Sequence, residues 1–307
     1  MGQERSYASS IFISNDNDFF NISTKGTDYY YTNGITIGFI NKIKRKNCFD
    51  RLMLSPKNSV FTIRKIFIDH KAQTPENITN TAIQWGDYPY AALLTLNYSN
   101  FSFFDSYSLA SQLTIGVIGP IAGGQEIQTF LHKKVFNSDL PQGWNNQLSN
   151  DIAINYKISG TKLLFETNNI ETTLHSELNL GTLYNNIMIS SSFRIGRFSS
   201  YYAPSAWLFD KCNSRTQLFI NISPFIKIVQ GNSLLEGGPI SALTHSRNKT
   251  YYIDRKNLQH FLYGYSWSLC YRNRWMAILF AENFYSTEIK GLNGHCFASL
   301  GFEFKIN

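Results

Sequence analysis

The chain has 307 residues and a formal net charge of +7. Only 16% of its residues are charged and 15% are aromatic, whereas typical soluble domains have roughly 25% charged residues. No apolar run approaches the roughly 18 residues of a spanning helix, which excludes a helical membrane protein. Aromatic and β-branched residues throughout the chain exclude a disordered one. A β-rich soluble protein or a membrane β-barrel remains.

Alternation of apolar and polar residues recurs along the chain and is clearest in FTIRKIFID, QLFINISPF and FASLGFEFK. Such a period of two is typical of strands with two different faces. No linker or low-complexity tract interrupts the pattern, so residues 1–307 are predicted to form one domain. The twelve predicted strands are Tyr7–Ser14, Tyr30–Lys42, Val60–Asp69, Tyr90–Ser102, Ser106–Ile118, Ile152–Asn168, Glu171–Thr182, Asn186–Arg197, Thr216–Val229, Gln259–Arg272, Trp275–Glu288 and Cys296–Lys305.

The two faces of these strands favour a membrane barrel. One face carries mostly Ser, Asn, Thr, Gln and Tyr, which suit a narrow barrel interior, and the other carries Leu, Ile, Phe and Tyr. Aromatic residues gather near strand ends, for example at Tyr29–Tyr31, as an aromatic girdle would. The alternative is that aromatic residues simply favour strands. We predict an all-β fold, a single twelve-stranded antiparallel transmembrane β-barrel of the outer membrane with a short helix in an extracellular loop.

The cysteines and the N-terminus bear on the compartment. The four cysteines, Cys48, Cys212, Cys270 and Cys296, are far apart and are predicted to be isolated thiols. The first residues, MGQERSYASS, have no basic segment followed by an apolar one, so we expect no signal peptide in this chain. The protein would then be cytoplasmic or the mature form of an exported one.

In an up-and-down barrel, the connections after odd-numbered strands all open at one rim. In this chain those connections hold the unusual sequences. They are Asn15–Asp28, His70–Pro89 with WGDYPYA, Gly119–Asn150 with GGQEIQTFLHKK, and Gln230–Leu258. Residues that are suited to catalysis or metal binding and are far apart in sequence are therefore predicted to meet at one rim.

The first candidate site is Asn15-Asp16-Asn17-Asp18, at the predicted end of strand one. Its hard oxygen donors are able to hold Ca²⁺. It is not an EF-hand, because the glycine at the sixth loop position and the closing Glu are missing. The alternative interpretation is a turn rich in Asn and Asp.

The second candidate is Gly123–Lys134, where Ile127, Phe130 and Leu131 have the spacing of one apolar helical face. Gln128 and His132 are four residues apart and therefore lie on the same side of such a helix. His132 is a candidate general base, because an imidazole titrates near neutral pH. The alternative is a surface histidine on a loop helix.

A third candidate is Thr32, where the second strand begins. Its hydroxyl can donate to a substrate or to water, or it can satisfy the barrel lumen. The chain has no GxSxG, HExxH, P-loop or GxGxxG motif, so a serine-hydrolase triad has no support.

The succession NDND, TDYYYTNG, WGDYPYA, GVIGPIAGGQEIQTFLH, PQGWNNQLSN, LGTLYNNIMISSSFRIG and FASLGFEF resembles the outer-membrane lipid A 3′-O-deacylase family (LpxR). The resemblance covers almost the whole chain in the right order. It implies a twelve-stranded outer-membrane barrel and a calcium-dependent hydrolase. This hydrolase removes the acyloxyacyl group that is ester-linked at the 3′ position of lipid A, in a site between the barrel wall and a loop helix.

Residue by residue, the resemblance places the family's essential pair at Asn15 and Asp16, which we also expect to be the Ca²⁺ ligands. It places the strand-two hydroxyl at Thr32 and the catalytic histidine at His132, with Gln128 one turn before it. His132 would take a proton from the attacking water, and Ca²⁺ would stabilise the oxyanion.

Substrate contacts follow from the same comparison. Asp87 matches the family, whereas Tyr88 stands where the family commonly has Arg, and Thr74–Gly86 has no Lys or Arg. Lys133 and Lys134 are expected to hold lipid A phosphates, or else to be solvated loop residues. Asp139 is a possible substitute for an acidic residue that some members carry after the histidine.

The expected partners are lipid A or lipopolysaccharide and the outer membrane, with no nucleic acid, and the protein is expected to be a monomer. We expect the mature form to lie in the bacterial outer membrane with its active site at the extracellular side. Two alternatives stay open: a non-enzymatic barrel such as a porin or adhesin, and an outer-membrane phospholipase.

Overall fold

The computed structural model describes residues 7–22, 31–210, 215–245 and 250–306. Twelve long strands pair antiparallel with their neighbours, and the last strand pairs with the first, so the sheet closes into a barrel. They are β1 (Tyr7–Asn17), β2 (Tyr31–Lys42), β3 (Phe61–Gln73), β4 (Ala91–Phe103), β5 (Tyr107–Ile118), β6 (Asp151–Glu166), β7 (Ile170–Gly181), β8 (Tyr184–Arg197), β10 (Gln217–Asn232), β11 (Phe261–Arg272), β12 (Met276–Tyr285) and β13 (His295–Ile306).

The predicted fold class is confirmed, and each of the twelve predicted strands corresponds to one of these. A short thirteenth strand, β9 (Phe209–Asp210), pairs only with Tyr7 and Ala8 at the start of β1. Strand β1 runs three residues beyond its predicted end at Ser14 and takes in most of the Asn-Asp run. Because Asn15 and Asp16 lie within this strand, their side chains point to opposite faces of the wall.

The barrel wall is apolar outside and polar inside. On β4, Leu94 and Leu96 are 38% and 53% exposed, while Thr95, Asn97 and Ser99 between and beside them are buried. Because side chains alternate across a strand, the exposed set faces outwards and the buried set faces the lumen. A surface of exposed Leu, Ile and Phe is costly in water and suits a bilayer. No helix in the described parts of the chain is long and apolar enough to cross a membrane.

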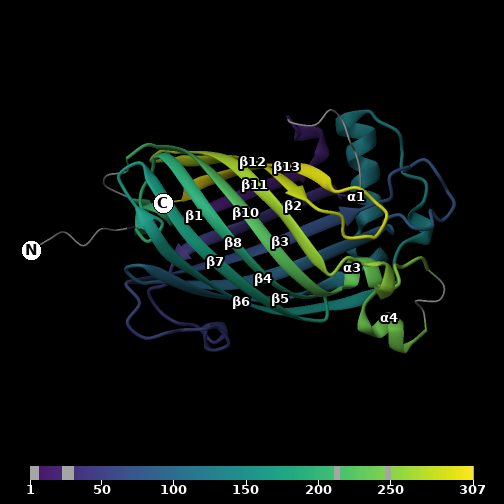
Figure 1. Ribbon diagram of the computed structural model, residues 1–307, viewed down its shortest axis with the longest axis horizontal. Helices are drawn as coiled ribbons and strands as arrows, with labels where there is room; N and C mark the ends of the chain where they lie inside the picture. The colour runs from purple at the N-terminus through teal and green to yellow at the C-terminus, as the bar shows by residue number, and fades with distance from the viewer. Residues whose placement is uncertain (1–6, 23–30, 211–214, 246–249, 307) are drawn as a thin grey trace, which may run out of the picture.

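The two ends of the barrel differ (Figure 1). Both chain termini lie at one end, and α1 (Gly124–Leu131), α3 (Ser233–Glu236) and α4 (Pro239–Leu243) lie at the other. The connections between β4 and β5, β6 and β7, and β11 and β12 are short turns at the end with the termini. The long connections after β1, β3, β5 and β10 all open at the helical end, as the parity of the strands predicts.

The connection between β8 and β10 closes the lumen at the end with the termini. It contains α2 (Pro204–Trp207). Tyr202 and Leu208 pack against Phe61, Ile63 and Phe103, and the Tyr202 hydroxyl donates to the Thr161 carbonyl at 3.1 Å. This apolar cluster closes that end of the barrel interior with side chains of the chain itself.

Helix α3 covers the lumen at the helical end. Gln73 Nε2 at the end of β3 donates to the Leu234 carbonyl at 2.8 Å. Leu235 is buried together with Tyr251 and Ile253 from the loop that follows. Both ends of the lumen are therefore occupied by the chain, and the barrel is not an open channel.

Candidate functional site

The connection between β5 and β6 forms the helix that the sequence predicts at Gly123–Lys134. Gly123 has a φ of 75°, a left-handed conformation that glycine adopts without strain, and α1 follows it directly. After Leu131 the helix widens into one π-helical turn, His132–Phe136, which ends at Asn137 with a φ of 48°. Single π-helical turns are frequent at functional sites, and this one begins at the candidate base.

The buried face of α1 is not the apolar face that the spacing predicts. Phe130 is 60% exposed, whereas Gln128 and His132 are only 1% and 5% exposed. Gly124, four residues before Gln128, is also buried. The prediction that Gln128 and His132 share one side of the helix is confirmed, and that side, rather than the one with Phe130, is the buried one. The physical reason is that this helix packs its small and polar stripe against a barrel and leaves its apolar residues outside.

Gly124 sets the distance between α1 and the wall. A Cβ at this position would lie 2.5 Å from the Ala92 Cβ on β4 and 2.6 Å from the Trp144 ring. Both are closer than carbon atoms approach without displacement. Only a glycine allows the helix to lie this close to the outside of the barrel.

We therefore expect Gly124→Ala to move α1 and to lower the activity proposed below by about tenfold to a hundredfold, since a displacement near 1 Å is enough for such a loss. The matched control is Gln125→Ala, because Gln125 is exposed on the same helix. Initial rates of the proposed activity for both variants, in barrels of equal thermal stability, test this. Equal rates for Gly124→Ala and wild type would contradict the role of the glycine.

Gln128 is held by the indole of Trp144. Trp144 Nε1 donates to Gln128 Oε1 at 2.7 Å, and Trp144 is itself 1% exposed. Gln128 Nε2 is buried without a hydrogen-bond partner among the described residues. A buried amide group that lacks a partner is costly, so this N–H group is available to a ligand or to water.

His132 is anchored by the turn that follows the helix. Its Nδ1 lies 2.6 Å from the Asp139 carbonyl oxygen and 2.9 Å from the Ser138 hydroxyl oxygen. Because a carbonyl only accepts, Nδ1 must carry the proton, and Nε2 then carries the lone pair that accepts one. Asp139, named as a possible acidic substitute, reaches His132 through its backbone carbonyl.

The structure separates Asn15 from Asp16. Both lie in β1, where Ile11 and Ile13 are exposed on the outside, so Asn15 faces outwards and Asp16 faces the lumen. Asn15 Nδ2 donates to Asn33 Oδ1 at 2.7 Å and to the Gly34 carbonyl at 3.0 Å on β2. Asp16 lines the luminal cavities together with Lys71. The interpretation of these residues as a turn is wrong, because they continue the strand.

The oxygen atoms around Asn15 are of the type that binds a hard cation. Among the described residues, no hydrogen bond occupies Asn15 Oδ1, so this amide oxygen can accept a metal. Ca²⁺ takes six to eight oxygen ligands, and no group of three His, Cys, Asp or Glu side chains is close enough in the described ranges to hold a metal ion. Most of a Ca²⁺ shell at this place would have to come from backbone, water or substrate oxygens.

Thr32 lies where β2 is irregular. The pairing of β2 with β3 shifts between Tyr31 and Asn33, which places Thr32 in a bulge at the helical end of the barrel. The side chain of Thr32 is outside the described residues. Bulges commonly redirect side chains next to active sites, so the backbone is consistent with a special role for this position.

Sequence reasoning gave no role to two further polar residues of the outer wall. His70 is 5% exposed and pairs with Ile35 across β3 and β2, and Asn33 is 2% exposed. Neither ring nitrogen of His70 nor Nδ2 of Asn33 has a hydrogen-bond partner among the described residues. Because β3 also contacts α1, these groups add to the polar lining between helix and wall. A polar residue at an outward-facing position of a membrane strand is the sequence feature by which these two residues can be identified.

Asp87, Lys133 and Lys134, the predicted substrate contacts, differ in their surroundings. Asp87 accepts hydrogen bonds from the backbone of Glu76 at 2.9 Å and of Tyr88 at 2.6 Å, so its carboxylate holds its own loop together. Burial raises the pKa of Asp87 above its usual value. Tyr88 is 2% exposed in the core under α3. Lys133 and Lys134 are exposed, and within the described chain no carboxylate pairs with either.

Exposed apolar side chains surround the helix. Ile121 before α1 is 64% exposed, Phe130 on α1 is 60% exposed, and Val135 after it is 58% exposed. They lie beside a wall whose outer face is also apolar. A buried histidine bordered by exposed apolar groups at the membrane boundary suits a substrate that carries hydrocarbon chains.

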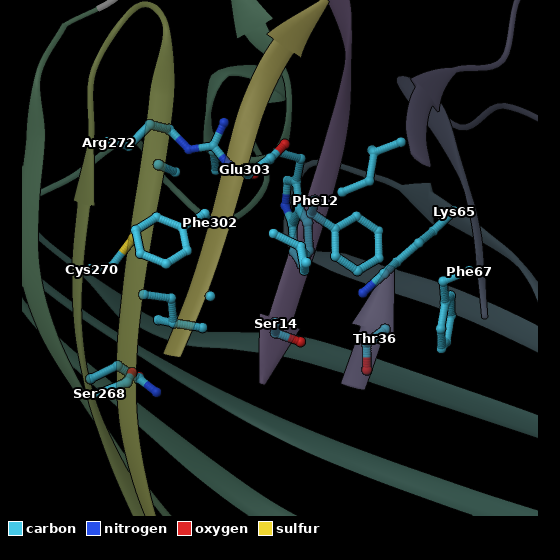
Figure 2. Close-up of a pocket in the computed structure, with 18 of the residues that line it drawn as sticks. Phe12, Ser14, Thr36, Lys65, Phe67, Ser268, Cys270, Arg272, Phe302 and Glu303 are labelled. Atoms are coloured by element: carbon cyan, nitrogen blue, oxygen red, sulfur yellow. Dashed lines mark hydrogen bonds and ion pairs between the residues drawn. The ribbon is translucent and has the colours of Figure 1, made fainter. Parts of the chain in front are cut away.

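A cavity inside the barrel lies apart from the predicted site residues on α1. About 600 Å³ of the lumen is enclosed by residues such as Phe12, Lys65, Phe302 and Arg272 (Figure 2). Arg272 pairs with Glu303 at 2.5 Å, and Lys65 Nζ lies 4.2 Å from the centre of the Phe12 ring. Of the predicted site residues, only Asp16 lines it. The wall therefore separates this cavity from α1.

A closed twelve-stranded barrel with an apolar outer face and a helix packed on its outside defines an outer-membrane β-barrel protein. The family model described as "Outer membrane protein LpxR" matches residues 1–306, and the chain belongs to the LpxR family. No curated protein sequence matches the chain.

Three solved structures are similar to the chain. LpxR from Salmonella typhimurium is 16% identical, with 97% of this chain and 100% of that chain covered, and the TM-score is 0.73. The β-domain of the Bordetella autotransporter BrkA is 8% identical, with 98% and 99% covered and a TM-score of 0.42. The KdgM porin is 6% identical, with 97% and 99% covered and a TM-score of 0.40.

Proposed function

We propose that the protein is a lipid A 3′-O-deacylase in which His132 activates the water that hydrolyses the 3′ ester. The observation that carries this proposal is the setting of His132. The imidazole is buried at the C-terminal end of α1, its Nδ1 is fixed by the Asp139 carbonyl, and the helix around it exposes apolar side chains. Membership of the LpxR family supports lipid A as the substrate.

The reaction needs one proton acceptor and one nucleophile. His132 Nε2 takes a proton from water, and the water oxygen attacks the ester carbonyl carbon. The bond between that carbon and the 3′ oxygen then breaks, and the imidazolium returns its proton to the 3′ oxygen. The products are the acyloxyacyl carboxylic acid and lipid A with a free 3′ hydroxyl. A base with a fixed tautomer makes a covalent acyl-enzyme unnecessary.

Other polar residues of the site would assist the reaction in different ways. The Gln128 Nε2–H group, which is held in place by Trp144, can donate to the developing oxyanion or to the attacking water. The exposed Lys133 and Lys134 at the end of the helix are placed to attract phosphate groups of lipid A. Asp87 supports this rim by ordering the loop before β4.

We propose Ca²⁺ as the cofactor, with Asn15 Oδ1 as its side-chain ligand from β1; the Asp16 side chain faces the lumen and is not proposed as a second ligand. A bound Ca²⁺ would supply positive charge where negative charge develops on the carbonyl oxygen. The hard oxygen chemistry of the segment supports this cation.

Removal of calcium by a chelator is expected to abolish deacylation, and Asn15→Ala is expected to raise the Ca²⁺ concentration for half-maximal activity at least tenfold. The control is Gln125→Ala, an exposed amide on α1 outside the Asn-Asp run. Calcium titrations of deacylation rate by wild type and both variants measure this. Full activity in the chelator would overturn the cofactor, and an unchanged titration for Asn15→Ala would overturn its ligand.

One observation counts against a porin. A porin needs a lumen that is open at both ends, whereas Tyr202 and Leu208 close one end of this lumen and Leu234 lies at the other. A phospholipase is distinguished by its product. Mass spectrometry after incubation with lipid A or with phospholipids in ¹⁸O-water tests the proposal: we expect one ¹⁸O atom in the acid released from lipid A, and release from phospholipid alone would overturn lipid A as substrate.

A further inference from the structure

The connection between β2 and β3, residues 43–60, is the second unusual surface of this barrel, at the opposite end from α1. We call it the basic loop. It contains η2 (Phe49–Arg51) and packs outside the wall, because the residues that it contacts on β3 to β6 point away from the lumen. In Figure 1 it is the dark purple-blue segment beside β6 at the end with the termini.

A buried carboxylate docks the basic loop. Asp50 is 1% exposed and pairs with Arg64 of β3. It also accepts hydrogen bonds from Asn100 Nδ2 at 2.7 Å and from the Tyr98 hydroxyl at 2.8 Å on β4. Arg64 and Asn100 are outward residues that would otherwise meet lipid. The loop covers them and therefore has a fixed position on the wall.

Two further hydrogen bonds extend the docked area. The Leu54 backbone N–H donates to the Ser111 hydroxyl of β5 at 2.8 Å. The Tyr156 hydroxyl of β6 donates to the Leu52 carbonyl at 2.9 Å. Arg64 lies three residues from the start of β3, about 10 Å along the strand. The loop therefore sits at the boundary between hydrocarbon and headgroups rather than out in water.

The free side of the basic loop is both apolar and strongly basic. Phe49 and Leu52 are 54% and 58% exposed. The five exposed cations are Lys44, Arg45, Lys46, Arg51 and Lys57. Among the described residues none of the five has a carboxylate partner, and Asp50, the one acidic residue of the loop, is already neutralised by Arg64. Apolar residues with cations at a membrane boundary form an interfacial anchor for anionic lipids.

We propose that the basic loop binds anionic glycerophospholipids, with Phe49 and Leu52 among the acyl chains and Lys44, Arg45, Lys46 and Arg51 at the headgroup phosphates. Charge complementarity carries the choice of lipid, because a zwitterionic headgroup gives no net attraction to four or five cations. This site is separate from the proposed hydrolytic site, which lies at the other end of the barrel. It would tie the barrel to the leaflet near the chain termini.

The test is native mass spectrometry of the whole protein from mixed micelles that contain equal amounts of phosphatidylglycerol and phosphatidylcholine. Wild type is expected to retain mainly phosphatidylglycerol. The variant Lys44→Gln/Arg45→Gln/Lys46→Gln is expected to lower the ratio of retained phosphatidylglycerol to phosphatidylcholine at least fivefold, since each cation near an anionic surface adds to the attraction. High salt should lower the wild-type ratio as well.

The matched control is Lys162→Gln/Arg215→Gln/Arg274→Gln, which removes three exposed cations from the same end of the barrel but outside the loop. Its lipid ratio is expected to stay within twofold of wild type. An unchanged ratio in the loop variant, or an equal fall in both variants, would overturn the assignment of the site to the loop. Circular dichroism of both variants establishes that each barrel is folded.

Discussion

The variant His132→Asn is expected to lose deacylation of lipid A by at least a hundredfold, and by up to about ten-thousandfold, while the barrel folds normally. Loss of a general base has this magnitude. Asn keeps a polar group of similar reach but has no basic nitrogen, so the hydrogen bond to the Asp139 carbonyl can survive while proton transfer cannot. Initial rates of lipid A deacylation by the purified proteins give the ratio.

The matched control is His245→Asn at the same end of the barrel. His245 is exposed and has a φ of 55°, a conformation that Asn adopts readily. This control should retain the wild-type rate. A rate for His132→Asn within tenfold of wild type would show that another group accepts the proton, and the buried His70 on β3 would then be the first alternative.

The variant Asp50→Ala is expected to lower the free energy of unfolding by about 3–5 kcal/mol, because it leaves the covered Arg64 without its partner. The same change removes the acceptor for Asn100 and Tyr98. Urea unfolding of the refolded barrel, followed by tryptophan fluorescence, measures the loss. Asp105→Ala is the control, because Asp105 is exposed in the short turn between β4 and β5 at the same end.

The pH dependence of the same carboxylate provides an independent measure. Burial raises the pKa of Asp50, but hydrogen bonds from Asn100, the Asn47 backbone, Tyr98 and Arg64 outweigh it and hold the pKa below the usual 3.8. A lowered pKa means that Asp50 contributes stability above pH 3.8, and this is lost as the pH falls through the folded pKa. The difference between wild type and Asp50→Ala should therefore shrink below pH 3.8. A difference that stays constant to lower pH would contradict the ion pair.

Much of the fold is predictable from the sequence because a membrane barrel exposes its apolar residues in strict alternation. All twelve long strands follow from that pattern, as does the position of the connections after β1, β3, β5 and β10 at one end. The end of β1 is harder to predict, because Asn and Asp have low strand propensity. In this barrel the neighbouring strands β2 and β13 pair with Asn15 and Asp16 and override that preference.

The sequence predicts that Gln128 and His132 share one side of a helix, but it does not predict the contacts that hold them. The four-residue spacing places Gln128 and His132 on one side of a helix, yet only the packing of Gly124 on Ala92 shows that this side is the buried one. The hydrogen bond that fixes His132 Nδ1 is to a backbone carbonyl, and the sequence does not predict where that carbonyl lies. His70 and Asp50 likewise depend on contacts between segments that a linear pattern does not report.

The most direct test of the central claim is mass spectrometry of lipid A from outer membranes in which this chain is exported, with the same membranes carrying His132→Asn as reference. The proposed function predicts loss of the 3′ acyloxyacyl mass in the presence of Ca²⁺ with wild type and full-length lipid A with the variant. Lipid A that keeps its 3′ group despite a folded wild-type barrel in the membrane would contradict the assignment of this protein as a lipid A 3′-O-deacylase.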